Sequence, residues 1–122
     1  IALVRLLTPT SDNQRIEKIV AHASGFLYYV SVLGITGSRH IDLAAVERAM
    51  ARLRKKINLP IVVGFGITKK EEAAALKNMV DGVVVGSSIV RVIGDGVAVG
   101  TNKKTIVAMV QDKVKDIASG LA

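Results

Sequence analysis

The chain has 122 residues, half of them hydrophobic, and carries 17 Lys and Arg against 10 Asp and Glu. This length fits one domain or part of one. The absence of cysteine excludes a disulfide scaffold, a thiolate zinc site and a catalytic thiol. No uncharged apolar run approaches the ~20 residues of a membrane span. We therefore expect a cytoplasmic protein that does not contact a membrane.

The first residues of the chain and its net charge limit the class of protein further. The opening Ile1-Ala2-Leu3-Val4 is typical of a buried strand and lacks an initiator methionine, which indicates a truncated amino terminus instead of a signal peptide. The net charge of +7 would suit a nucleic-acid partner, but only four aromatic residues exist to stack on bases. Five of the basic residues crowd one helix end: Arg48, Arg52, Arg54, Lys55 and Lys56. A solvated helix end is favoured, with no nucleic-acid partner.

Short apolar runs alternate with amphipathic stretches along the chain, which predicts a βαβαβαβα order. Strands are predicted over residues 3–7, 26–30, 61–63 and 83–85. The first helix follows Ser11-Asp12-Asn13-Gln14 and the third follows Thr68-Lys69-Lys70-Glu71, both of which match the capping-box pattern. The second helix spans residues 43–57, a short helical turn spans 87–92, and a last helix includes residues 106–117.

Two architectures fit this order. The runs are apolar on both faces, which is typical of parallel strands covered by helices. Four βα units are half of the ~250 residues of an eight-stranded barrel, whereas an open four-stranded sheet is the alternative. An enlarged loop over residues 32–42 is the irregular feature in either case.

Ligand sites in both architectures lie at the carboxyl ends of the strands. Gly64-Phe65-Gly66 follows the third run, and Gly86-Ser87-Ser88 follows the fourth and opens a helical turn. Glycine admits an anion to the backbone, and a helix amino terminus offers free N–H groups. Each glycine pair alone is more typical of a tight turn, but together they favour a phosphate site.

Candidate groups for acid or base chemistry are scarce. Every carboxylate is expected in or beside a helix or at the opposite end of the sheet, and none directly ends a strand. The long loop contains Gly34-Ile35-Thr36-Gly37, which is either a lid whose Thr36 reaches the substrate or an ordinary surface loop. Tyr28 and Tyr29 should point to opposite faces of their strand. The sequence thus predicts a binding site without a complete catalytic set and without a metal site.

These segments resemble one known family. Phe26 to Ser31, the Gly-Ile-Thr-Gly loop, the 60–67 segment with its Gly-Phe-Gly, and the 81–90 segment with its Gly-Ser-Ser look like the carboxyl-terminal half of the tryptophan synthase alpha chain. The resemblance covers nearly the whole chain from Leu3. It implies an α/β fold of the TIM (β/α)₈ barrel family, with this chain forming strands five to eight. Residues 1–122 would then be a single (β/α)₄ half-barrel.

The resemblance also implies a function. The family cleaves indole-3-glycerol phosphate to indole and glyceraldehyde 3-phosphate by a retro-aldol reaction, without a cofactor in this subunit. Pyridoxal phosphate belongs to the beta subunit, which would be a partner. Carried over by motif, the substrate and phosphate contacts would come from Tyr28, Gly37, Gly64, Phe65, Gly66, Gly86 and Ser87. Thr36 would align a catalytic aspartate.

Departures from the family pattern keep alternatives open. The family's acid/base glutamate and indole-binding aspartate belong to the other half of the barrel, so the chain alone should be inactive and needs its amino-terminal half. Val32-Leu33 stands where many members have an arginine. The alternatives are a free-standing half-barrel that binds phosphate and dimerises without lyase activity, and another phosphate-binding barrel such as a sugar-phosphate isomerase.

Overall fold

A computed structural model describes residues 1–31, 42–64 and 66–122 of the chain. Its strands are β1 (Arg5–Leu7), β2 (Leu27–Val30), β3 (Ile61–Gly64) and β4 (Gly82–Val84). Its helices are α1 (Asn13–Val20), α2 (Leu43–Arg54), α3 (Lys70–Leu76), α4 (Ser87–Ala98) and α5 (Lys103–Ser119). The predicted alternation of strands and helices is confirmed, and the strand bounds differ from the predicted ones by at most two residues.

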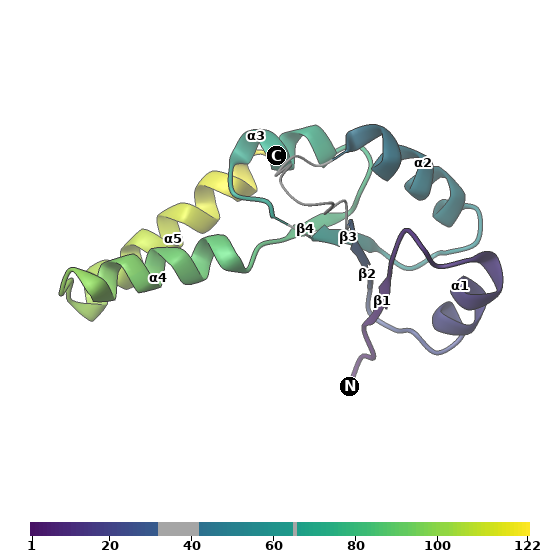
Figure 1. Ribbon diagram of the computed structural model, residues 1–122, viewed down its shortest axis with the longest axis horizontal. Coiled ribbons are helices and arrows are strands. Elements are labelled where there is room, and N and C mark those ends of the chain that lie inside the picture. Colours follow the sequence, from purple (N-terminus) through teal and green to yellow (C-terminus); the bar gives the residue numbers. More distant parts are fainter. Residues whose placement is uncertain (32–41, 65) are drawn as a thin grey trace.

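The strands form one parallel sheet in the order β1-β2-β3-β4. Every strand pairs with the strand before it, and the register aligns Leu6 with Tyr28, Tyr28 with Val62 and Val62 with Gly82. Figure 1 shows the helices returning the chain from one end of the sheet to the other. This connectivity brings the carboxyl ends of all four strands to one edge.

The hydrophobic core lies on one face of the sheet. Alternate strand residues are fully covered there by α1, α2, α3 and the end of α5. The core side chains are Leu7, Leu27, Tyr29, Ile61 and Val63 from the strands, and Ile16, Val46, Met50, Leu53, Ala73, Leu76 and Ile117 from the helices. Because Tyr29 is buried in this core and Tyr28 is only half-buried, the two tyrosines do lie on opposite faces.

The opposite face of the sheet is partly open. Leu6 is 59% exposed, and its register partners Tyr28, Val62 and Gly82 are half-buried. This face would point inward in a barrel, because the helices cover the other one. The open face is apolar, so it needs further chain or a partner to become a second core.

The helix starts show where the capping predictions were one residue off. In α1 the N-cap is Asp12, not Ser11, and its carboxylate accepts from the Arg15 N–H at 2.8 Å. In α3 the carboxylate of Glu72, not Glu71, accepts from the backbone N–H groups of Thr68 and Lys69 at 2.6 and 3.1 Å. Both sequences offered two adjacent polar candidates, and the helix phase selects between them.

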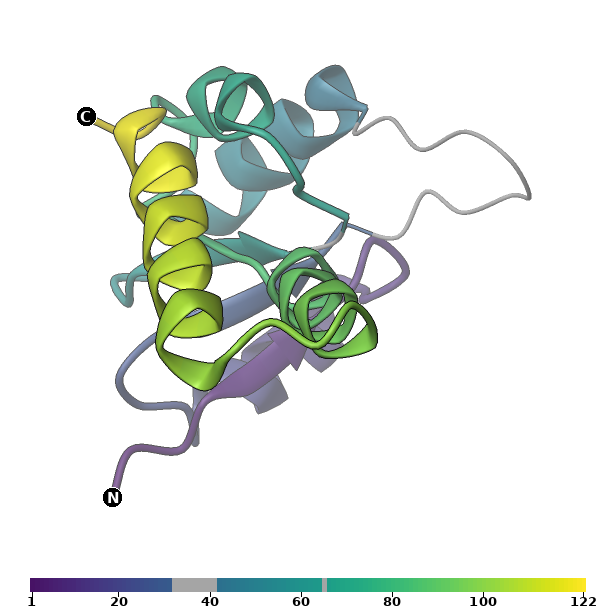
Figure 2. The same ribbon diagram turned by 90° about the vertical axis from the view of Figure 1, so that its left-hand side faces the viewer.

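The prediction of a short turn over 87–92 was wrong. Residues Ser87–Ala98 form a helix of 12 residues, which with α5 makes a hairpin that projects away from the sheet (Figures 1 and 2). Gly94 and Gly96 made the sequence after residue 92 look unsuited to a helix, because glycine weakens a helix in isolation. Here Gly96 lets the two helices approach closely: a Cβ added at Gly96 would lie 2.8 Å from Cγ1 of Ile106.

The predicted lid residues lie outside the described part of the chain, as do most residues of the enlarged loop. In the described residues, no helix is long and apolar enough to cross a membrane.

Candidate functional site

The candidate site lies at the carboxyl edge of β3 and β4. These strands are adjacent and parallel, with Gly64 aligned to Val84 at their ends. The segments that follow, which contain Gly66 and Gly86, therefore emerge side by side. The structure thus brings together the two glycine segments that the sequence singled out.

The amino terminus of α4 supplies the main polar groups of this edge. Gly86 is the N-cap, and no side chain of the described residues caps the helix. Gly86 and Ser87 are exposed, and a Cβ added at Gly86 would meet no atom within 4 Å. Because the first N–H groups of a helix lack intrahelical acceptors and carry the positive end of its dipole, this position suits an anion.

Gly66 shapes the neighbouring segment. Its φ of +73° lies in the left-handed region that favours glycine, and it is exposed with open space where a side chain would stand. An anion can therefore approach its backbone. A larger residue would add strain as well as bulk.

Gly64 and Tyr28 are close-packed on the open face of the sheet. A Cβ added at Gly64 would overlap the hydroxyl of Tyr28, so the tyrosine lies directly over this glycine. The absent side chain at Gly64 makes room for the Tyr28 ring near the carboxyl edge. Tyr28 is thereby placed on the side of the sheet where a barrel would hold its substrate.

The remaining predicted residues are not placed. Gly37, Phe65 and the loop residue Thr36 lie outside the described residues. Tyr28, Gly64, Gly66, Gly86 and Ser87 lie along one edge of the sheet and its inner face. Their contacts with a ligand stay predictions.

The two carboxylates with shifted pKa values lie elsewhere and have structural partners. Asp81 precedes β4, at the opposite end of the sheet, and accepts from the Ile61 N–H at 2.7 Å and from Arg54 at 2.5 Å. Burial raises its pKa, but these hydrogen bonds outweigh burial and lower the pKa overall. The pKa of Glu72 is lowered in the same way by the N–H groups that it caps, again against the effect of burial. Sequence reasoning missed both anchoring roles.

The basic group at the end of α2 is largely engaged with the protein. Arg54 pairs with Asp81, Lys56 pairs with Glu17 at 2.7 Å, and Arg52 donates to the carbonyl of Ser11 at 3.1 Å. These contacts tie α2 to α1, to β4 and to the loop after β1. They give the cluster a structural role.

The parallel βα units and the loops at their carboxyl edge define a chain of the TIM barrel class, of which it forms four βα units. The comparisons identify the family. A family model described as tryptophan synthase alpha chain matches residues 1–120. The chain belongs to the tryptophan synthase alpha chain family.

Individual relatives agree with the family match. The chain is 50% identical over 95 residues to the tryptophan synthase alpha chain of Rhizorhabdus wittichii, and 46% identical over 93 residues to that of Novosphingobium aromaticivorans. These matches cover 78% and 76% of this chain but 35% of each relative. The chain therefore spans about a third of the length of these relatives.

A solved structure shows the same fold. The tryptophan synthase alpha subunit of Campylobacter jejuni superimposes with a TM-score of 0.75 at 32% identity, over 96% of this chain and 44% of that one. The comparisons favour the alpha chain family over a free-standing half-barrel and over a sugar-phosphate isomerase.

Proposed function

We propose that this chain is the carboxyl-terminal half of a tryptophan synthase alpha subunit, and that it supplies the phosphate site for aldol cleavage of indole-3-glycerol phosphate. The observation that carries the proposal is the uncapped amino terminus of α4 beside the left-handed Gly66, at adjacent strand ends. Family membership supports the choice of ligand proposed for this edge. The setting is cytoplasmic tryptophan biosynthesis.

Each described residue has a proposed task. The N–H groups at Ser87 and Gly86 bind the phosphate, with the Ser87 hydroxyl as a further donor. Gly66 lets the anion approach, and Tyr28 contacts the indole side of the substrate over Gly64. Substrate contacts of Gly37 and Phe65, which lie outside the described residues, are proposed from the family resemblance alone.

Catalysis needs residues beyond this set. Cleaving a carbon–carbon bond by a retro-aldol route requires an acid/base group to move protons on the substrate. The resemblance to the family places the proposed acid/base groups in the amino-terminal half, and the described carboxylates with shifted pKa values, Asp81 and Glu72, hold structural hydrogen bonds instead. Thr36 would position one of the proposed acid/base groups. The subunit itself uses no cofactor, and the indole passes to a beta subunit that carries pyridoxal phosphate.

Substitution of Gly86 in the intact protein tests the phosphate site. Gly86→Asp places a negative charge against the anion, while Gly86→Asn places a neutral side chain of the same shape there. Both residues are good N-caps, so α4 should remain folded. Binding of indole-3-propanol phosphate, measured by calorimetry, should fall at least tenfold more in Gly86→Asp than in Gly86→Asn.

A matched control is Gly94→Asp, which adds the same charge two turns along α4 at a position with open space. Its affinity should stay within twofold of the parent protein. Equal affinities in the Gly86→Asp and Gly86→Asn variants would overturn the proposed site.

A further inference from the structure

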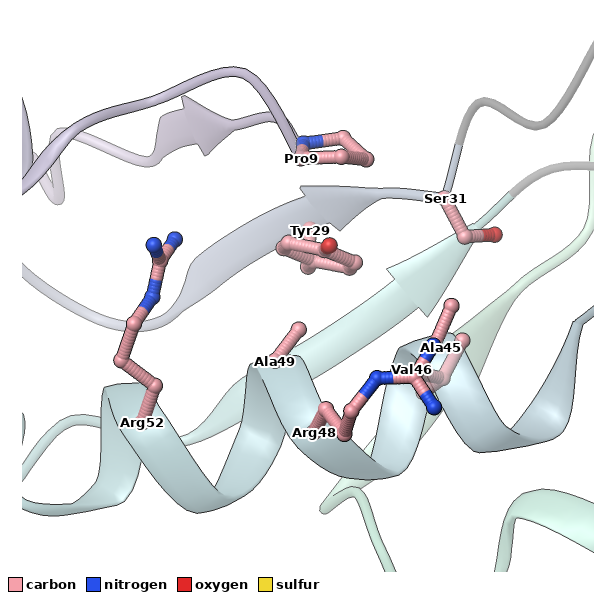
Figure 3. Close-up of a pocket in the computed structure, with 8 residues that line it drawn as sticks. All are labelled: Pro9, Tyr29, Ser31, Ala45, Val46, Arg48, Ala49 and Arg52. Atoms are coloured by element: carbon pink, nitrogen blue, oxygen red, sulfur yellow. The ribbon is translucent and has the colours of Figure 1, made fainter.

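A pocket with several polar groups lies on the helix-covered side of the sheet, away from the carboxyl edge of β3 and β4. It encloses about 260 Å³ between α2, the end of β2 and the loop after β1. The lining residues are Pro9, Tyr29, Ser31, Ala45, Val46, Arg48, Ala49 and Arg52. Figure 3 shows the Tyr29 ring between Pro9 and α2, with the two arginines extending from the helix on either side.

The charged residues that line this pocket are both arginines. Arg48 and Arg52 contribute two positive charges, and none of the described residues that line the pocket is a carboxylate. The ion pairs in the described part of the chain, Arg54 with Asp81 and Lys56 with Glu17, involve neither of these arginines. Arg52 donates one hydrogen bond to the Ser11 carbonyl, and this bond holds its guanidinium in place.

Ser31 adds an independent sign of a binding site. Its residue is only 7% exposed, and its hydroxyl has no hydrogen-bond partner among the described residues. A buried hydroxyl without a partner costs free energy, and such groups are rare in native proteins. Because Ser31 lines the pocket on the same side as Arg48 (Figure 3), a bound oxygen atom would satisfy it.

Tyr29 provides a second hydroxyl at the same pocket. Burial raises the pKa of Tyr29, more than the charge of Arg52 lowers it. The hydroxyl therefore stays protonated at neutral pH and is a hydrogen-bond donor. Two hydroxyls and two guanidiniums together form a donor set suited to tetrahedral oxyanions.

We propose that this pocket binds a small oxyanion, phosphate or a phosphate monoester, through Arg48, Ser31 and Tyr29, with Arg52 adding positive charge. The site is separate from the one at the carboxyl edge, because its residues face the helix-covered side of β2. The pocket lies between the loop after β1 and α2, which the Arg52–Ser11 hydrogen bond already connects, so a bound anion would add a second polar link between them.

NMR of the intact protein with methyl-labelled alanine tests the site directly. Inorganic phosphate should cause saturable shifts of the Ala45 and Ala49 methyl signals, which report on this pocket alone. Arg48→Gln should weaken that binding about tenfold, because a hydrogen bond to a charged group is lost. Tyr29→Phe and Ser31→Ala should each weaken it severalfold without removing the surrounding packing.

The controls separate this site from the proposed phosphate site. Arg15→Gln removes one exposed arginine of α1 outside the pocket and should leave the titration unchanged. Gly86→Asp should also leave the Ala45 and Ala49 shifts unchanged, whether or not it abolishes binding at α4. A titration with glycerol 3-phosphate then shows whether the ester binds more tightly than the free ion.

The proposal is overturned if phosphate gives no saturable shift at Ala45 and Ala49. It is equally overturned if the shifts persist at the same affinity in Arg48→Gln. Saturable binding that Arg48→Gln and Ser31→Ala both weaken supports it.

Discussion

Single carboxylates fix the ends of several elements in this chain. Glu72 caps α3 from within its first turn, whereas the side chain of its exposed neighbour Glu71 makes no hydrogen bond to the described residues. Two residues of the same type, adjacent in sequence, thus have different energetic roles.

Replacing each of these glutamates separately tests that difference. Glu72→Ala should lower the free energy of unfolding by about 1 kcal/mol, the usual effect of losing a helix cap. Glu71→Ala should change it by less than about 0.5 kcal/mol, as expected for an exposed site. Urea denaturation of the intact protein measures both, and equal losses would contradict the assignment of the cap to Glu72.

Asp81 makes stability depend on pH. Its pKa is lower in the folded chain than in the unfolded one, because Ile61 and Arg54 stabilise the carboxylate more than burial disfavours it. The stabilisation is therefore fully present above the unfolded pKa of about 3.9 and is lost as the pH falls through the folded value. Between about pH 5 and 2, the Asp81→Asn variant should lose less stability than the parent.

Thermal denaturation over that pH range checks this expectation. Asp112→Asn, at an exposed position on α5, serves as the control and should follow the parent curve. Parallel pH curves for the parent and Asp81→Asn would show that Asp81 is not the linked group.

At the scale of elements, the α4–α5 hairpin depends on one glycine and not on another. Gly94 and Gly96 are two residues apart on α4, but only Gly96 faces α5, where it meets Ile106. Gly94 has open space around it. The close approach of the helices therefore depends on Gly96.

Alanine at the two positions should have opposite effects. Gly94→Ala should stabilise the protein by about 0.5–1 kcal/mol, since alanine is the better helix former. Gly96→Ala should destabilise it by about 1–3 kcal/mol, because its Cβ forces Ile106 away from α4. Differential scanning calorimetry distinguishes the signs, and stabilisation by both variants would contradict the close packing.

The elements also show what the sequence could predict. The four strands were predictable because their apolar runs are short and bounded by turns, and because parallel strands covered by helices leave an unbroken Val, Ile and Leu pattern. The positions of Gly66 and Gly86 at the carboxyl ends of β3 and β4 were predictable for the same reason, since these glycines closely follow two apolar runs.

The length of α4 and the caps at Asp12 and Glu72 were not predictable. Packing of Gly96 against Ile106 overrides the low helix propensity of glycine, and that contact joins two separate helices, α4 and α5. The pocket beside Ser31 was equally hidden, because its lining comes from three separate segments. The helix packing and the pocket depend on tertiary contacts, which periodicity does not contain. The caps are local, but periodicity does not show which of two adjacent polar residues the helix phase selects.

At the scale of the whole molecule, apolar surface remains uncovered on the open sheet face and along the hairpin. Leu6 is 59% exposed, Val90 66% and Val97 64%. In an intact alpha subunit, the proposed amino-terminal half would cover this surface. Alone, residues 1–122 present exposed strand edges next to it, a combination that favours association.

Residues 1–122 expressed alone should therefore self-associate at micromolar concentrations. The association should strengthen with salt, because screening weakens the mutual repulsion of chains that each carry a net charge of +7. Leu6→Glu should weaken it, while Ala44→Glu, at an exposed position on α2, should not. Sedimentation velocity measures each case, and a monomer at all concentrations would refute the expectation.

The consecutive strand order has a consequence for biosynthesis. Each strand pairs with the one made just before it, so the ribosome releases every new βα unit beside a finished neighbour. Contacts between successive units span short stretches of chain, which favours rapid pairing. The sheet can therefore grow strand by strand during translation, and α5, whose Ile117 enters the core, covers the last unit once it has been synthesised.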